Sequence, residues 1–426
     1  MPKLLIKNGR VIDPASKFDA VADVLLEDGL IAAVGPNLSA AGAEIFDATG
    51  LIVAPGFIDM HVHLREPGFE HAETIESGSR AAAAGGFTSV CPMPNTSPVN
   101  DNATVTSYIV EKAKRHAIVN VWPIGAITKG SKGEELAAIS SMRNAGAVAI
   151  SDDGQPVMNA RMMRRAMELA NSHGIPVINH CEDLHLSAGG DMHEGFESVR
   201  RGLRGIPGCS EDVMVARDIL LAEVTGAHYH VAHISSKHSV EMVQFAKARG
   251  LRVTSEVTPH HIALADRDTL PFDSNYKMKP PLRSCGDVDA MIAGVVSGAI
   301  DAIATDHAPH PGSEKMQEFE KCPFGILGLE TAIGVSLEQL VHPGNIHVVR
   351  MVEMFTTGPA RILKLNRGTL ALRSPADVTI FSMDREWTYD VNKSASRSRN
   401  SPFDGKTFRG GPVATIVRGE VVWQAA

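Results

Sequence analysis

Two histidines, His61 and His63, stand two residues apart at the end of a short apolar run that begins at Phe57. In a β-strand, residues i and i+2 point to the same face, so both imidazoles can reach one metal ion. Imidazole is the commonest metal ligand in proteins, but it also occurs often in structural roles. The pair alone therefore leaves a metal site and a chance arrangement open, and the rest of the chain must decide between them.

The overall composition is that of an ordinary globular protein: 426 residues, 44% hydrophobic and 21% charged, with a net charge of -8. A chain of this length can bury a large core and form one large domain, alone or with a smaller one. The negative charge argues against a nucleic-acid partner, which would require a basic face. Local cations must then bind any anionic substrate.

The first residues contain no long apolar region, and no stretch approaches about 18 uncharged apolar residues, so the sequence predicts neither export nor a membrane partner. The five cysteines are odd in number and show no CxxC spacing, which is typical of free thiols in a reducing compartment. We therefore expect a cytoplasmic protein.

The elements that must position the histidines change in kind along the chain. Short β-type runs separated by Asn-Gly, Asp-Gly and Gly-Pro turns occupy residues 4–54, a pattern typical of antiparallel strands. From residue 55, β-rich runs alternate with helical patterns such as residues 160–172, which predicts βαβ units around a parallel sheet. The eight predicted strands are residues 56–61, 86–91, 118–125, 147–151, 176–180, 228–233, 252–257 and 301–305.

Eight such units predict an α/β fold, a closed (β/α)8 barrel of the TIM type. After residue 370 the β pattern returns, at 376–381 and 413–422. We expect these strands to pair with those of the N-terminus. The predicted domains are a small β-sandwich from residues 1–54 and 370–426, and a metal-dependent hydrolase barrel from residues 55–369.

Polar side chains recur where the predicted barrel strands end, which is where such barrels carry their chemistry. Each of them alone could be a satisfied core residue. Together they favour a histidine–carboxylate metal centre, and nitrogen and oxygen ligands without a thiolate favour zinc, with manganese and cobalt as alternatives. The strand ends carry His61 and His63 after the first strand, Asp152 and Asp153 after the fourth, His180 and Glu182 after the fifth, His233 after the sixth, and Asp306, His307 and His310 after the eighth.

For other polar residues near these strand ends, the sequence gives weaker evidence of a role in the site. Arg65 follows His63 by two residues and so points into the same mouth, where its guanidinium could bind a carboxylate; the alternative is a surface ion pair. Asn95 lies on a proline-stiffened loop at the same rim and offers an amide donor. Core or orienting roles are favoured for the remaining histidines of these strands, His228, His230, His260 and His261.

Seven segments resemble, in their order, the signature segments of cyclic amidohydrolases, and within that group of the bacterial (class I type) dihydroorotases of the pyrimidine pathway. The resemblance spans the whole chain. The segments are DMHVHLREPG (59–68), MPNT (93–96), SDDG (151–154), INHCED (178–183), HISS (233–236), TDHAPH (305–310) and PFGILGLET (323–331).

The resemblance implies a site with two zinc ions per subunit. One ion would be held by His61, His63 and Asp306, and the other by His180 and His233, with Asp153 bridging them. It also implies contacts to a small-molecule substrate, contributed by His63, Arg65, Asn95, His310 and the backbone of Phe324 and Gly325.

The implied reaction is the reversible cyclisation of N-carbamoyl-L-aspartate to L-dihydroorotate in de novo UMP biosynthesis. In the hydrolytic direction, a metal-activated hydroxide attacks the ring amide while Asp306, the general base, carries its proton to the departing ring nitrogen. Arg65 and Asn95 would clamp the substrate carboxylate. We also predict that residues 311–322 form a mobile loop over the pocket.

Two positions depart from the pattern. Many relatives, hydantoinases among them, bridge their metals with a carboxylated lysine, but this chain has no lysine between Lys132 and Lys237. Lys279 stands where the resemblance predicts a substrate-contacting asparagine. The alternatives are a hydantoinase-like or allantoinase-like enzyme, and a non-catalytic scaffold for a carbamoyltransferase, although a scaffold should have lost ligands. A homodimer and a complex with a carbamoyltransferase both remain open.

Overall fold

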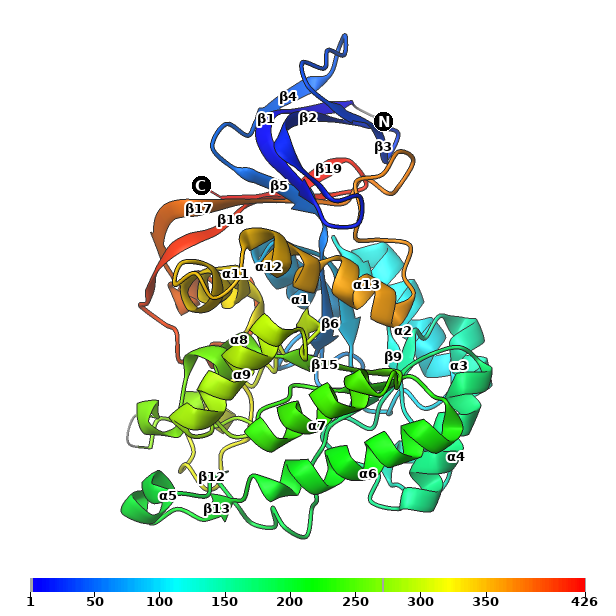
Figure 1. Ribbon diagram of the computed structural model, residues 1–426, viewed down its shortest axis with the longest axis vertical. Helices are drawn as coiled ribbons and strands as arrows, with labels where there is room; N and C mark the ends of the chain where they lie inside the picture. Colours follow the sequence, from blue (N-terminus) through cyan, green and yellow to red (C-terminus); the bar gives the residue numbers. More distant parts are fainter. Residues whose placement is uncertain (1–2, 270–271, 426) are drawn as a thin grey trace.

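A computed structural model describes residues 3–269 and 272–425 (Figure 1). The parallel strands of the barrel are β6 (Phe57–Val62), β7 (Phe87–Pro92), β8 (Asn120–Val121), β9 (Ile124–Gly125), β10 (Ala149–Ile150), β11 (Val177–Asn179), β14 (Tyr229–Val231), β15 (Val253–Val257) and β16 (Ala302–Ile303). They pair in the order β6-β7-β8 and β9-β10-β11-β14-β15-β16. A parallel bridge between Val62 and His307 brings the last strand beside the first. The predicted closed barrel is therefore confirmed.

The third barrel position differs from the continuous strand predicted at 118–125. It consists of β8, which pairs with β7, and β9, which pairs with β10. Pro123 lies between them and has no backbone N–H to donate to a ladder. The strand is consequently broken at this residue, although the Trp122 N–H still donates to Val90.

Helices alternate with the barrel strands and cover their outer surface (Figure 1). The predicted helix at 160–172 is confirmed as α4, which Asn159 caps by accepting from the N–H groups of Arg161 and Met162. Its buried residues, Met163, Ala166, Met167 and Ala170, follow the helical period. The other helices are α1 (Ile75–Ala84), α2 (Ala103–His116), α3 (Ile139–Ala145), α5 (Phe196–Arg201), α6 (Cys209–Thr225), α7 (Lys237–Ala248), α8 (Pro259–Ala263), α9 (Cys285–Ser297), α10 (Gly312–Lys315), α11 (Ala332–Ser336), α12 (Val348–Phe355) and α13 (Thr357–Leu363).

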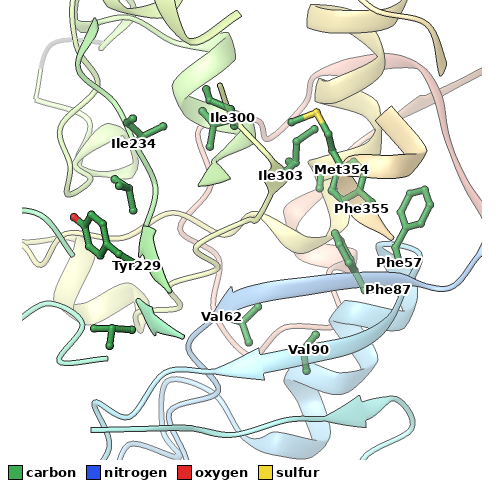
Figure 2. Packing of buried hydrophobic residues seen from close by; sticks show 14 of the residues in the cluster. Phe57, Val62, Phe87, Val90, Tyr229, Ile234, Ile300, Ile303, Met354 and Phe355 are labelled. Carbon is green, nitrogen blue, oxygen red and sulfur yellow. The ribbon is translucent and has the colours of Figure 1, made fainter. Parts of the chain in front are cut away.

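An aromatic cluster fills the amino end of the barrel, opposite the strand ends that carry the polar residues (Figure 2). The rings of Phe57 and Phe355 stack at 4.9 Å, and Phe87 packs edge-on against both. Phe57 also packs 5.8 Å from Phe381 of the C-terminal region. Burial of these large side chains stabilises the barrel and joins it to the neighbouring β region.

That β region is one sheet built from both chain ends, in the order β19-β18-β17-β5-β1-β2-β3, with β4 paired to β1. The predicted joining of the two ends is made by the antiparallel pair β5–β17. The sheet encloses its own apolar core, which gives it a sandwich-like form. The strands are β1 (Leu4–Asp13), β2 (Phe18–Glu27), β3 (Leu30–Gly35), β4 (Glu44–Asp47), β5 (Ile52–Pro55), β17 (Val378–Thr388), β18 (Thr407–Val417) and β19 (Glu420–Gln424).

The antiparallel pattern predicted for residues 4–54 is right for β1, β2 and β3 and wrong for the strands after them. β4 and β5 both run parallel to β1. Short turn motifs specify hairpins between neighbours, whereas the pairing of β4 and β5 with β1 is non-local and carries no such motif. The domain boundaries after residues 54 and 369 stay a prediction, and residues 1, 2 and 426 of the predicted β domain lie outside the described residues.

Two further short strands, β12 (Met192–His193) and β13 (Gly205–Ile206), pair with each other beside the barrel. Within the described residues, no helix is both long and apolar enough to cross a membrane. All five cysteines are free, as expected.

Candidate metal centre

Six side chains from five strand ends converge at the carboxyl-end mouth of the barrel, and we refer to them as the six-residue cluster. None of the six is more than 5% exposed. They follow, or lie on, the strands β6, β10, β11, β14 and β16, and all were predicted as ligands: His61, His63, Asp153, His180, His233 and Asp306.

The cluster contains three overlapping sets of three ligand atoms, each set lying within 4.8 Å, which is close enough to hold a metal ion. Asp153 belongs to two of the sets, one with His61 and His63 and one with His180 and His233. A carboxylate shared in this way can bridge two neighbouring ions.

Hydrogen bonds orient the two histidines of β6. His61 Nδ1 lies 2.7 Å from Glu256 Oε1, so its proton lies on that side and Nε2 faces the cluster, 3.3 Å from Asp153. His63 Nδ1 lies 2.9 Å from Asn95 Oδ1, which leaves Nε2 free to face Asp306 at 2.9 Å. Oriented imidazoles of this kind are typical of metal sites.

The other two histidines form a second half of the cluster. His180 Nε2 donates to Glu182 over 2.9 Å, so Nδ1 presents its lone pair to the cluster. That nitrogen lies 2.9 Å from His233 Nε2, and both approach Asp153 Oδ1, at 3.7 and 3.6 Å. Asp153 therefore faces imidazole nitrogens from both halves.

Two atoms at the middle of the cluster, His61 Nε2 and Asp153 Oδ1, are buried and make no hydrogen bond with any described residue. Buried polar atoms normally have a partner. Both atoms belong to the candidate ligand sets, and four imidazoles with two carboxylates and no thiolate suit a divalent ion such as zinc. The residues present thus fit a metal ion.

The electrostatics of the cluster keep both of its acids ionised. Burial disfavours the charged form of Asp153, but the surrounding imidazoles, His61 foremost, outweigh it and hold the pKa of Asp153 well below its usual range. Burial also raises the pKa of Asp306, but His61 and His63 outweigh burial and lower the pKa below its usual range. Both groups are therefore carboxylates at neutral pH.

The backbone at the cluster is held in conformations that side chains rarely adopt. Arg65, His233 and Asp306 have φ values of 60°, 29° and 46°. A positive φ at a residue other than glycine costs free energy, and this conformation persists only where the surrounding structure imposes it. Next to Asp306, Asp59 accepts hydrogen bonds from the backbone N–H groups of His61 and Thr305 and so ties the first strand to the eighth.

The remaining predicted residues lie beside the cluster. Arg65 Nε donates to the Pro309 carbonyl over 3.2 Å, and His310 Nε2 lies 2.9 Å from the Phe324 carbonyl. At Gly325, with φ at 157°, an added Cβ would lie 2.6 Å from the Ala308 carbonyl. Asn95, predicted to contact substrate, also holds His63 and lies 3.4 Å from Asp153 Oδ2.

The sequence analysis missed Glu256 and Asp59, although each is a charged residue inside a predicted barrel strand. Such a residue is rarely buried without a specific partner. Both are fully buried. His230 Nε2 lies 3.2 Å from Glu256 Oε2, and the hydrogen bonds of His230 and His61 lower the pKa of the buried Glu256 to about 2.

Lys279, which stands where the family resemblance predicts an asparagine, lies beside the site. Its ammonium lies 2.6 Å from Glu182 Oε1 and 5.1 Å from the centre of the Phe324 ring. With residues 320–324, it lines a cavity of about 500 Å³. The mobility predicted for residues 311–322 stays a prediction.

Two relatives match the chain over nearly its whole length. "Dihydroorotase" of Solibacter usitatus is 71% identical over 420 residues, covering 99% of this chain and 98% of the relative. "Dihydroorotase" of Pelotomaculum thermopropionicum is 55% identical, covering 99% of each. The chain belongs to the dihydroorotase family. Residues 50–239 match the model of the family described as dihydro-orotase-like.

The fold of this dihydroorotase-family chain also resembles solved amidohydrolase structures. The L-hydantoinase (dihydropyrimidinase) from Arthrobacter aurescens superposes with a TM-score of 0.90 at 27% identity, covering 100% of this chain and 96% of the other. The likeness confirms the barrel with its accompanying β domain. Together with the family, it identifies the chain as a cyclic amide hydrolase.

Proposed function

We propose that this chain interconverts N-carbamoyl-L-aspartate and L-dihydroorotate, as the names of its relatives imply. The observation that carries the proposal is the six-residue cluster, which is complete, buried and shared between two halves by Asp153. It occurs in a chain 71% identical to a dihydroorotase.

The ligands are proposed to be His61, His63 and Asp306 for one zinc ion and His180 and His233 for the other, with Asp153 between them. Bound zinc would activate water and polarise the ring carbonyl near neutral pH. The chain's own contribution is to hold the lone pairs inward, through Glu256 on His61, Asn95 on His63 and Glu182 on His180.

Asp306 is the proposed general base. As an ionised carboxylate it has an oxygen that can take a proton from the attacking water, and its place in the cluster would keep it close to the reacting carbonyl. The proton then passes from Asp306 to the departing ring nitrogen as the amide bond breaks. In the reverse direction Asp306 takes the proton from the carbamoyl nitrogen.

Arg65, His310, Phe324 and Gly325 form what we call the substrate rim. The guanidinium of Arg65 would bind the substrate carboxylate, a charge-assisted interaction suited to a planar anion. His310 and the backbone of Phe324 and Gly325 would bind the ring. Asn95 would add an amide contact from the side of His63.

The hydantoinase-like and allantoinase-like alternatives share this fold and the ring-amide chemistry. Asp153 occupies the place between the two halves of the cluster, and no lysine lies between Lys132 and Lys237. Arg65 further favours a substrate that carries a carboxylate. A non-catalytic scaffold is disfavoured because all six ligand-type residues are present. A homodimer, a carbamoyltransferase partner and a cytoplasmic location stay predictions.

The test is to purify the protein, measure its zinc content and assay it in parallel on dihydroorotate, hydantoin and allantoin. We expect about two zinc ions per chain, by the family resemblance, and hydrolysis of dihydroorotate well ahead of the other rings. Preferred hydrolysis of hydantoin or allantoin would replace the proposed substrate, and no turnover of any ring by zinc-loaded protein would support the scaffold.

A further inference from the structure

A polar segment of the C-terminal region, residues 394–401, extends from the β domain to the mouth of the barrel. Alternate side chains of this segment are buried: Ser394, Ser396, Ser398 and Asn400 are between 2% and 7% exposed, whereas Arg397 and Arg399 are exposed. The segment thus turns one polar face toward the barrel.

Its serines attach the segment to loops that follow barrel strands. Ser394 Oγ donates to Glu330 Oε1 over 2.6 Å, Ser396 Oγ donates to Glu73, and Ser398 Oγ donates to the Ala72 carbonyl over 2.8 Å. The contacts fix the segment's position up to Asn400.

Asn400 joins two loops of the site. Its Oδ1 accepts from the His310 N–H over 3.1 Å, and its Nδ2 donates to the carbonyls of Ala308 and Gly325 over 2.9 and 3.0 Å. Its own carbonyl accepts from the Leu327 N–H over 2.9 Å. Both amide protons and the amide oxygen of this 2%-exposed side chain are therefore in use.

The two loops also meet through His310 Nε2, which lies 2.9 Å from the Phe324 carbonyl, and in a short parallel ladder. A bridge pairs His307 with Ile326, and the Ala308 N–H donates to Ile326 over 3.0 Å. Next to this ladder, the Asn400 side chain links the two loops again through its hydrogen bonds to His310 and Gly325. The side chain acts there as an additional rung between the two loops.

We propose that Asn400 is a positioning residue, which sets the separation of His310 from Phe324 and Gly325 and thereby the shape of the substrate rim. The inference deepens the proposed function, on which its kinetic part rests. Asparagine suits the task because it offers two donors and an acceptor on one short planar group. A carboxylate at this position would face two carbonyl oxygens, and an alanine would remove all three side-chain hydrogen bonds.

The experiment compares Asn400→Asp with the parent, using Asn392→Asp as the matched control at an exposed position eight residues earlier in the chain. For Asn400→Asp we expect the KM for dihydroorotate to rise about tenfold, the effect of losing one or two hydrogen bonds. We expect kcat to stay within a few-fold, since the six-residue cluster is untouched. The control should match the parent.

Hydrogen–deuterium exchange supplies a readout independent of activity. In Asn400→Asp, the amides of Ala308, His310 and residues 325–327 should exchange faster, while those of the barrel strands keep the parent rate. An unchanged KM, or faster exchange spread evenly over the barrel, would show a merely structural role and overturn the proposal.

Rapid exchange of the His310 and Leu327 amides in the parent would overturn the proposal without any variant. A parent that does not hydrolyse dihydroorotate would refute the proposed function, while the exchange data would still decide whether Asn400 orders the two loops.

Discussion

The six-residue cluster and the substrate rim lie side by side at one mouth of the barrel, but they are held in place by different means. The cluster residues sit on or just after barrel strands and are oriented by buried partners such as Glu256 and Glu182. His310, Phe324 and Gly325 lie on loops, held by Asn400 and by the Lys315 ammonium, which donates to the Gly325 carbonyl. Under the proposed function, the barrel would hold the reacting groups, and segments far apart in the sequence would position the groups that bind the substrate.

The largest effect should come from removing the metal. Because the cluster is the only visible means of activating water among the described residues, chelator-treated protein should lose dihydroorotate hydrolysis and regain it with added zinc. Activity and metal content should be followed together during the titration. Full turnover by metal-free protein would contradict the role given to the cluster.

Next in size is Glu256→Gln, which weakens the partner of His61 without touching a proposed ligand. Loss of such an orienting carboxylate typically costs about 10-fold to 100-fold in metal affinity. Competition with a chelator of known affinity measures the metal affinity. Glu241→Gln, at an exposed position, is the control. Metal affinity equal to the parent's would mean that His61 needs no such support.

Arg65→Ala should mainly affect recognition. A charge-assisted hydrogen-bonded pair contributes about 1.5 to 3 kcal/mol, which corresponds to roughly 10-fold to 150-fold in KM. Steady-state kinetics on dihydroorotate measure it, with zinc content expected to stay at the parent level. Arg80→Ala, on the exposed face of α1, is the control. If KM stayed the same, Arg65 would have to be removed from the substrate rim.

The smallest effect is expected for Lys279→Asn, which restores the residue predicted by the family resemblance. The ammonium pairs with Glu182 but remains partly exposed, and such pairs contribute at most about 1 kcal/mol, or roughly fivefold. KM for both substrates should therefore change only a few-fold. A change beyond tenfold would show that Lys279 itself binds substrate.

The contrast between cluster and rim also explains what could be predicted from the sequence. Strand ends of a barrel meet at one face, so the pattern of apolar runs followed by histidines and acids predicted the fold and a histidine–carboxylate centre, while the choice of Asp153 over Asp152 came from the family resemblance. Asn95 was predicted only as a substrate contact, since its bond to His63 depends on how its loop closes.

Two other features could not be predicted from the sequence, because both depend on contacts between residues far apart in the chain. The parallel pairing of β4 and β5 with β1 is non-local, and so is the contact of Asn400 with loops about 75 to 92 residues away in the chain. The alternation of serines in residues 394–400 is a visible signal of a half-buried extended segment. It does not say which loops that segment contacts.

The central claim is that the cluster both binds metal and moves the proton, and Asp306→Asn tests it most directly. Asparagine keeps the shape but cannot accept a proton as a carboxylate does. With five other ligands in place, the zinc content should stay near that of the parent, while kcat falls by about 100-fold to 10,000-fold. A fully metal-loaded Asp306→Asn protein that hydrolyses dihydroorotate within a few-fold of the parent would contradict the base assignment and the mechanism built on it.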